Sequence, residues 1–211
     1  MTERYKNPAL TVDTIIFSIR DKTLKLLLIK RKNPPFQDKW AIPGGFVDYE
    51  EDIPDAAYRE LEEETGIQGI SLEQVRTFGT PGRDPRGRTV SVVYFSLINS
   101  AGLEIRADTD AKEAGWFSVY DLPETAFDHA EIIDFTVRFL RQKLENTPVA
   151  RHAMPEKFSL EELREVYEII LNKTLNHEIF KQKITETNLL EKAGDSVYKF
   201  RESMDFIGRF S

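Results

Sequence analysis

One segment of the chain, residues 45–67, limits its possible fold more than any other. It fits the pattern G-x5-E-x7-R-E-U-x-E-E-x-G-U, in which U is an apolar residue. The fixed positions are filled by Gly45, Glu51, Arg59, Glu60, Glu63, Glu64 and Gly66, and the apolar positions by Leu61 and Ile67. Pro54 suits the first turn of a helix that ends near Gly66. The segment therefore predicts a loop followed by a short helix crowded with carboxylates.

The three glutamates Glu60, Glu63 and Glu64 lie three and four positions apart, so they share one face of that helix. Like charges at this spacing destabilise a helix by about 0.2–0.5 kcal/mol per pair. A divalent cation removes the repulsion, and Mg²⁺ prefers carboxylate oxygen while leaving positions open for phosphate. The alternative is an acidic face exposed to solvent. The sequence "PGGF" before the helix favours the metal site, because glycine lets the backbone approach a ligand closely.

The whole pattern resembles the signature of the Nudix hydrolases, and none of its fixed positions departs from it. The resemblance implies an α/β/α sandwich over about residues 8–145 and hydrolysis of a nucleoside diphosphate linked to another moiety. It implies that Glu60, Glu63 and Glu64 hold Mg²⁺ or Mn²⁺, with the carbonyl of Gly44 as a further ligand. The same metal would lower the pKa of a bound water. Arg59 and Glu51 would brace the loop and the helix.

The sequence offers two candidates for the general base that takes the proton from this water. Glu113, in "DTDAKEAGW", lies where several Nudix proteins place an additional acidic ligand or base, and Asp110 is its rival. Either residue could instead be an ordinary acid of a surface loop. The three histidines form no ligand spacing, so none is expected to bind metal or to act in catalysis: His129, His152 and His177.

A second cluster, in "TPGRDPRGRTVSVVYF", places Arg83, Arg86 and Arg88 directly before a strand. The arginine fork suits phosphate oxygens, and the two glycines of the loop permit tight turns. The alternative is the solvated tip of a hairpin. The loop also resembles that of Nudix proteins that handle ADP-ribose and of their regulator relatives. The resemblance implies ADP-ribose or a close analogue as the ligand.

The rest of the first part predicts strands and a closing helix. Apolar and β-branched runs at 11–19 and 24–30 flank a polar turn and predict a hairpin, and residues 89–98 predict a buried strand. Asp128 and Glu131 suit a capping box for a helix whose apolar positions are Ile133, Val137, Leu140 and Leu144. We expect a first domain at 1–145, a linker with two prolines at 146–157, and a second domain at 158–211.

The second domain has the plan of a winged helix-turn-helix. Ser159 and Glu162 predict a capping box for a helix at 158–171, and residues 176–190 predict a second helix with Ile179, Phe180 and Ile184 inward. A turn and an alternating strand follow. The predicted DNA-binding residues are His177, Lys181, Gln182 and Thr185 on the second helix and Lys192 and Lys199 on the wing.

Nearly the whole chain resembles the Nudix-related transcriptional regulators of the nicotinamide-related, NrtR-like type. The resemblance implies a Nudix domain that senses a ligand such as ADP-ribose, a winged helix that binds operator DNA, and a homodimer. The complete set of motif residues favours a working hydrolase as well. The alternative is a plain Nudix diphosphatase whose second domain serves dimerisation. The apolar tail Met204–Phe210 suits docking, and the sequence gives no partner for it.

Charge and composition set outer bounds on these interpretations. Residues 1–150 carry 19 basic and 25 acidic residues, and residues 151–211 carry 10 and 11, so neither part has a strong basic footprint. The chain has no cysteine, which excludes disulfides and thiolate metal sites. It has no apolar run long enough to cross a membrane and no apolar leader. We therefore expect a cytoplasmic protein.

Overall fold

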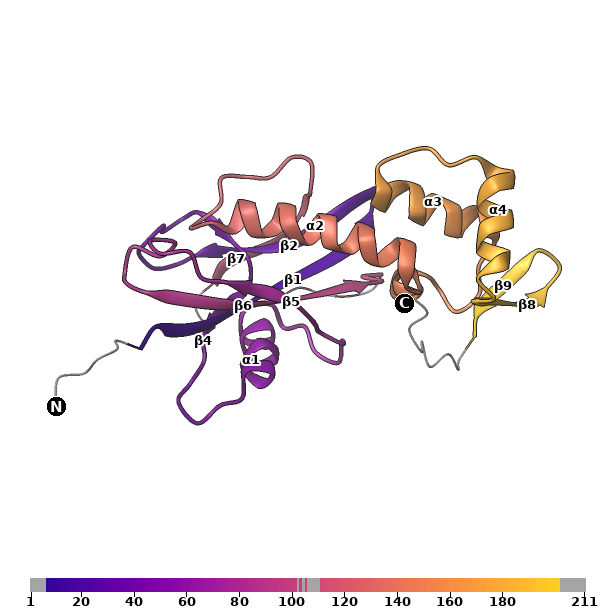
Figure 1. Ribbon diagram of the computed structural model, residues 1–211. Coiled ribbons are helices and arrows are strands. Elements are labelled where there is room, and N and C mark those ends of the chain that lie inside the picture. The colour runs from indigo at the N-terminus through magenta and orange to yellow at the C-terminus, as the bar shows by residue number, and fades with distance from the viewer. Residues whose placement is uncertain (1–6, 102, 104, 106–110, 202–211) are drawn as a thin grey trace. The chain divides into compact units, whose positions relative to one another are not determined.

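The computed structural model of the chain describes residues 7–101, 103, 105 and 111–201 (Figure 1). Two compact units, residues 1–140 and 141–211, make up the chain and are described separately. Asp110 and the tail Met204–Phe210 lie outside the described residues. Among the helices of the described part, none is both long and apolar enough to span a membrane.

The first unit is built on a seven-stranded sheet. The central path runs β3-β2-β1-β6-β5, with β4 paired to β1 and β7 paired to β2. The strands are β1 Ala9–Arg20, β2 Thr23–Arg31, β3 Trp40–Ala41, β4 Gly44–Phe46, β5 Glu73–Phe78, β6 Thr89–Ile98 and β7 Ala111–Ser118. The predicted hairpin is confirmed, because β1 and β2 pair antiparallel with Phe17 opposite Leu26. The predicted buried strand is β6, which runs parallel to β1 at the centre of the sheet.

Two helices lie on opposite faces of this sheet, α1 (Ile53–Thr65) and α2 (His129–Asn146) (Figure 1). On the α1 face, Ala56 and Ala57 pack with Val12 and Val92. On the α2 face, aromatic pairs form the contact, with ring centroids 5.7 Å apart for Phe78 and Phe135 and 5.4 Å apart for Phe95 and Phe139. The arrangement confirms the predicted α/β/α sandwich.

The boundaries of α1 follow from local chemistry. Asp52 precedes the helix in an extended conformation, and a proline occupies its first turn. Gly66 ends the helix in the left-handed region at φ 72°, and its N–H donates to the Glu62 carbonyl. The buried side of the helix includes Leu61 and also Glu64, so one carboxylate of the motif faces inward.

The helix α2 is confirmed with its predicted apolar face, since Ile133, Val137, Leu140 and Leu144 are all buried. The predicted capping box of Asp128 and Glu131 is not how the structure uses these residues. Both carboxylate oxygens of Asp128 accept hydrogen bonds from Arg83 instead. A charged partner distant in sequence has replaced the local cap.

The second unit follows the predicted order of helix, turn, helix and hairpin. Its elements are the 3₁₀ helix η1 Val149–Ala153, α3 Leu160–Leu171, α4 His177–Glu186, β8 Leu190–Gly194 and β9 Val197–Phe200. The capping box of α3 is confirmed, because the Ser159 hydroxyl accepts from the Glu162 N–H and the Glu162 carboxylate accepts from the Ser159 N–H. Phe180 and Ile184 are buried as predicted.

Three details of the second unit differ from the sequence prediction. Ile179, expected to face inward, is 56% exposed. The helix α4 ends at Glu186, four residues short of the predicted end, because the backbone turns at Thr187 and Asn188 adopts a positive φ of 55°. The segment 146–157, expected to lack regular structure, contains η1, with Ala150 and Met154 buried. The position of the domain boundary itself stays a prediction.

Candidate functional site

The guanidinium group of Arg59 organises the glutamate cluster. Its Nε and Nη2 donate to the two carboxylate oxygens of Glu51 at 2.7 and 2.8 Å, which ties the loop to α1. Its Nη1 donates to Glu60 at 2.8 Å and to Glu63 at 3.3 Å, and Nη2 also donates to the carbonyl of Phe46. These hydrogen bonds lower the pKa of Glu51. The cation therefore stands among four acceptors from the loop and the helix.

A backbone donor holds the buried end of the cluster. The carboxylate of Glu64, which is only 6% exposed, accepts a hydrogen bond of 2.8 Å from the N–H of Gly44. A Cβ atom at Gly44 would overlap the carbonyl oxygen of Val12, so this close approach requires glycine. The predicted role of the Gly44 carbonyl as a metal ligand stays a prediction.

Electrostatics distinguish Glu60 from its neighbours. Burial raises the pKa of Glu60, and the nearby charges of Glu63 and Glu51 raise it further, while Arg59 opposes the shift. The charged form of Glu60 is thus disfavoured in the protein alone. A bound cation would relieve this cost.

The donor set fits a magnesium ion when phosphate supplies further oxygens. Within the described ranges, no three acidic or histidine side chains are already arranged to hold a metal. Glu60 and Glu64 line one cavity, whereas Glu63 lies outside its lining. Mg²⁺ is commonly held by one or two carboxylates together with water and substrate phosphates, so two converging carboxylates are sufficient. Glu60 and Glu64 would hold the ion, and a direct role of Glu63 stays a prediction.

The cavity has a volume of about 380 Å³ and brings carboxylates and guanidinium groups together. Besides Glu60 and Glu64 it is lined by Arg31, Arg83 and Arg86. Its size falls in the range of small-molecule sites, which is about 300–1,000 Å³. A pocket that offers metal-binding acids and phosphate-binding cations suits a nucleoside diphosphate derivative.

Two of the three arginines predicted to bind the ligand, Arg83 and Arg86, line the cavity, and they are held differently. Arg83 is buried, and its Nε and Nη2 donate to Asp128 at 2.9 and 2.7 Å. Arg86 is half-exposed and donates to both carboxylate oxygens of Asp84. The guanidinium carbon of Arg86 lies 5.0 Å from the ring centroid of Phe46 and 5.5 Å from that of Phe127, as in cation–π contacts.

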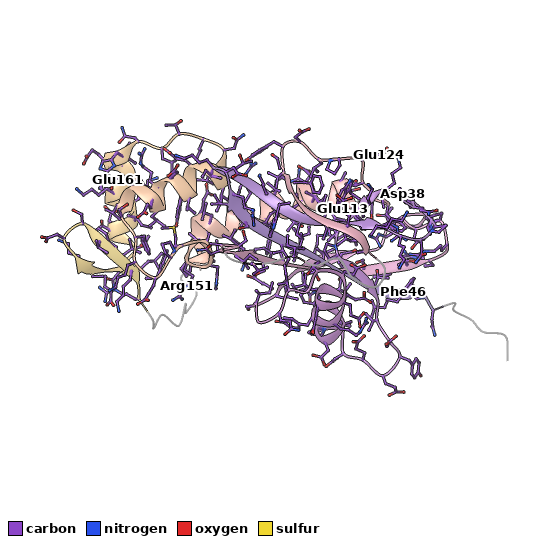
Figure 2. All side chains as sticks on the ribbon, turned by 180° about the vertical axis from the view of Figure 1, so that it is seen from behind. Asp38, Phe46, Glu113, Glu124, Arg151 and Glu161 are labelled. Atoms are coloured by element: carbon purple, nitrogen blue, oxygen red, sulfur yellow. The ribbon has the colours of Figure 1, made fainter. Side chains whose placement is uncertain are left out.

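Arg88 and Glu113, like Glu51 and Glu63, do not line the cavity. The Nη1 of Arg88 donates to the carbonyl of Thr89. Glu113 is exposed on β7 with its carboxylate 3.5 Å from Nζ of Lys30, and Figure 2 shows it apart from Phe46, which does line the cavity. The predicted roles of Arg88 in ligand binding and of Glu113 as general base have no geometric support here and stay predictions.

Sequence reasoning overlooked a buried polar group at the cavity, Asp13 with His129. The Nδ1 of His129 accepts a hydrogen bond of 2.9 Å from the N–H of Ile42, and its Nε2 lies 3.6 Å from Asp13. Asp13 also accepts a hydrogen bond from the hydroxyl of Ser91. Burial lowers the pKa of His129, and its Nδ1 already accepts the hydrogen bond from Ile42, so the neutral ring carries its proton on Nε2 and is no base for a water. The one available signal was an aspartate inside the apolar strand "TVDTIIFSI".

The predicted DNA-binding residues of α4 lie on its outer side. Lys181, Gln182 and Thr185 are exposed and line one shallow hollow. The side chain of Gln182 donates to Glu186, and the Thr185 hydroxyl donates to the Lys181 carbonyl. The Nδ1 of His177, at the start of the helix, lies 3.3 Å from the carboxylate of Glu161.

The predicted wing residues belong to the β8–β9 hairpin. Lys192 is exposed on β8. The Nζ of Lys199, on β9, lies 2.9 Å from Glu191. The structure therefore places both lysines on one hairpin, and their contact with DNA stays a prediction.

Two protein families match the two parts of the chain. Residues 9–136 match the NUDIX domain, and residues 150–201 match the NrtR DNA-binding winged helix domain. An ADPR responsive transcriptional repressor NtrR from Acinetobacter baylyi is 37% identical over 196 residues, which cover 91% of this chain and 78% of the relative. An ADP-ribose pyrophosphatase from Methanocaldococcus jannaschii is 43% identical over 135 residues, which cover 64% of this chain and 76% of the relative.

Solved structures support the same assignment. A MutT/nudix family protein from Enterococcus faecalis has a TM-score of 0.85 at 31% identity, and the match covers 95% of this chain and 89% of the Enterococcus chain. Shewanella oneidensis NrtR complexed with a 27mer DNA has a TM-score of 0.75 at 31% identity, and the match covers 91% of this chain and 93% of the NrtR chain. The NUDIX domain of that NrtR complexed with ADP ribose has a TM-score of 0.61 at 32% identity, and the match covers 66% of this chain and 93% of the domain's chain.

The domain order agrees with these matches over most of the chain: a glutamate-rich cavity in an α/β/α sandwich precedes a winged helix. The chain belongs to the NrtR-type family of transcriptional regulators, in which a Nudix domain is followed by a winged helix domain.

Proposed function

We propose that this protein is a DNA-binding transcriptional repressor whose Nudix domain binds ADP-ribose, or a close analogue, and hydrolyses it with Mg²⁺. One observation carries the ligand part of the proposal. Glu60 and Glu64 line the same cavity as Arg83 and Arg86. Such a cavity pairs acceptors for a metal with donors for a diphosphate, which is the combination that cleavage between two phosphates requires.

The chain's own residues have distinct tasks in this proposal. Glu60 and Glu64 would hold the metal, whose chemistry when bound is to neutralise the charge of the diphosphate and to lower the pKa of a coordinated water. Arg59 fixes the carboxylates of Glu51 and Glu60 in place. Arg86, with the rings of Phe46 and Phe127, offers flat surfaces on which a nucleobase can stack.

The second unit is assigned to DNA binding because helix, turn, helix and hairpin present α4 with an exposed polar side. A helix of this kind enters the major groove and contacts base edges with its N-terminal residues. We propose a homodimer, because two-fold symmetric operators present two half-sites. A cytoplasmic location is consistent with this function.

The ligand proposal is tested by Mg²⁺-dependent turnover of ADP-ribose, measured with the purified full-length protein and with Glu64→Gln. We expect release of AMP by the wild type and at least about a 100-fold loss in the variant, since even groups that support a metal ligand cost 10–100-fold. Tight ADP-ribose binding without turnover would make the domain a sensor only. If the protein neither binds nor hydrolyses ADP-ribose, ADP-ribose is excluded as the ligand.

A second function, that of a diphosphatase whose second unit serves only dimerisation, is favoured by the charge of residues 151–211, with 10 basic and 11 acidic residues. A balance so close to neutral is weak for a nucleic-acid-binding surface. The two functions are separated by DNA binding of the full-length protein at a stated salt concentration, with and without ADP-ribose. Affinity for one duplex well above that for random duplex would exclude the second function.

A further inference from the structure

The exposed side of α4 carries one apolar side chain. Ile179 is 56% exposed, whereas Phe180 and Ile184 on the same helix are buried. All other exposed large hydrophobic side chains in the described part of the chain are aromatic, so Ile179 is the single aliphatic one. Its place in the sequence pattern predicts an inward position, and the structure turns it outward.

The backbone explains why this orientation is stable. The side chain of Asn176 caps α4 by accepting a hydrogen bond of 3.1 Å from the backbone N–H of Ile179. This cap starts the helix at His177 and makes Ile179 its third residue. Phe180, the next residue, then takes the inward position and packs its ring 5.2 Å from that of Tyr167. Ile179 is consequently left on the outer side.

The neighbours of Ile179 are all charged or polar, and two of them are acidic. It lines a shallow hollow together with Glu178, Lys181, Gln182, Thr185 and Glu186. Lysine binds phosphate, and glutamine pairs with adenine in the major groove. A bare aliphatic group among them has one matching partner on a base edge, the C5-methyl group of thymine. The third residue of a recognition helix is also within the N-terminal part that contacts bases.

We propose that Ile179 is a specificity-determining residue that contacts a thymine methyl group in the major groove of the operator. The proposal rests on the proposed DNA-binding function and goes further, because it assigns one base type to one side chain. Lysines of α4 set affinity through phosphate, and Ile179 selects thymine at one position of each half-site.

The test removes the thymine methyl group from the DNA and the Ile179 side chain from the protein, singly and together. A tight-binding duplex is first selected from a random library with the full-length protein. Each thymine of that duplex is then replaced singly by deoxyuridine, which lacks only the methyl group, and binding is measured for the wild type and for Ile179→Ala. We expect one deoxyuridine position to weaken the wild type by about fourfold, the value of one buried methyl group. In Ile179→Ala the same replacement should have no further effect.

Two control variants keep the outcome specific. Ile179→Val retains a branched apolar group and should keep most of the sensitivity to deoxyuridine. Lys183→Ala, on an exposed position of the same helix, should weaken binding to every duplex and lower the dependence on salt without changing the response to deoxyuridine. Because the capping bond uses the backbone N–H of Ile179, Ile179→Ala should leave the Tm unchanged.

Each other result has a defined meaning. A selected duplex whose deoxyuridine replacements act equally on the wild type and on Ile179→Ala would overturn the thymine contact and leave the repressor function standing. A fall in Tm of several degrees for Ile179→Ala would overturn it too, because the side chain would then be packed against protein. If no duplex is enriched over random DNA, the thymine contact and the DNA-binding function both fail.

Discussion

The cavity of the first unit and the outer side of α4 hold their polar residues in opposite ways. In the cavity the charged groups are bound to one another, as Arg59 is to Glu51 and Arg83 is to Asp128. On α4 the polar side chains are exposed, and Lys181 and Gln182 line an open hollow. The cavity is therefore prepared for its ligand before the ligand arrives. On α4, Gln182 and Thr185 make hydrogen bonds within the helix and stay exposed to solvent, so we expect each side chain to contribute less to binding and its contribution to depend more on salt.

The strongest test of this contrast is the removal of a bound charge in the cavity. Arg83→Ala leaves the carboxylates of Asp128 and Asp13 without their guanidinium partner in a buried site. We expect the free energy of unfolding to fall by about 3–5 kcal/mol, measured by urea denaturation. A double-mutant cycle with Asp128→Asn isolates the pair. If Lys181→Ala, on α4, costs as much stability, the contrast is broken.

The next test concerns the metal site. Glu64→Gln should lower Mg²⁺-dependent turnover by at least about 100-fold while the duplex affinity in the absence of ligand stays unchanged. Glu113→Gln serves as the matched control, since Glu113 is exposed and lies outside the cavity lining. An equal loss in both variants would restore Glu113 as the general base.

A smaller effect is expected at the capping box of α3. Ser159→Ala removes the acceptor of the Glu162 N–H and should lower the free energy of unfolding by about 1 kcal/mol. Ser159→Asn should recover most of the loss, because asparagine is a good N-cap residue. Full stability of the alanine variant in urea denaturation would show that the cap contributes nothing.

A further test measures how much Lys181, on the exposed side of α4, contributes to the affinity for DNA. Lys181→Ala should weaken binding severalfold on every duplex and reduce the slope of log affinity against log salt by about 0.9, the value for one lost phosphate contact. Binding is measured by titration at several salt concentrations. An unchanged slope would remove Lys181 from the DNA interface.

The smallest effect is a gain in stability. The pKa of Glu60 is raised in the folded protein, so its charge opposes folding, and the wild type loses stability as pH rises through that pKa. Glu60→Gln should therefore raise the Tm of the metal-free protein at pH 7 by about 1–3 °C while turnover falls. The gain in Tm should vanish at low pH, where Glu60 is neutral as well. A gain that persists at low pH would assign the effect to packing.

Local patterns allowed much of the fold to be predicted from the sequence. The hairpin of β1 and β2, the helix α1 between Pro54 and Gly66, and the capping box of Ser159 depend on neighbours in the chain. The motif also identified Glu60 and Glu64 of the cavity. Such features are set by residues within a few positions of one another, so one sequence carries them.

The remaining parts of the site depend on contacts distant in sequence. The pairing of Arg83 with Asp128 joins residues 45 positions apart and overrides the local cap that Asp128 suits. The hydrogen bond from Ile42 to His129 spans 87 positions. No periodicity records such contacts. Ile179 was misplaced because apolar spacing alone does not say which of two adjacent residues, Ile179 or Phe180, packs inward.

The glycine at position 45 leaves room for the carboxylate of Glu60. A Cβ atom there would overlap the carboxylate of Glu60, one of the two acids suited to the metal. Gly45→Ala would push that acid aside while the guanidinium groups of the cavity, Arg83 and Arg86, and the whole second unit stayed as they are. Under the proposed function, a single methyl group would thus separate a regulator that consumes its signal, and so resets itself, from one that waits for the signal to be cleared by others.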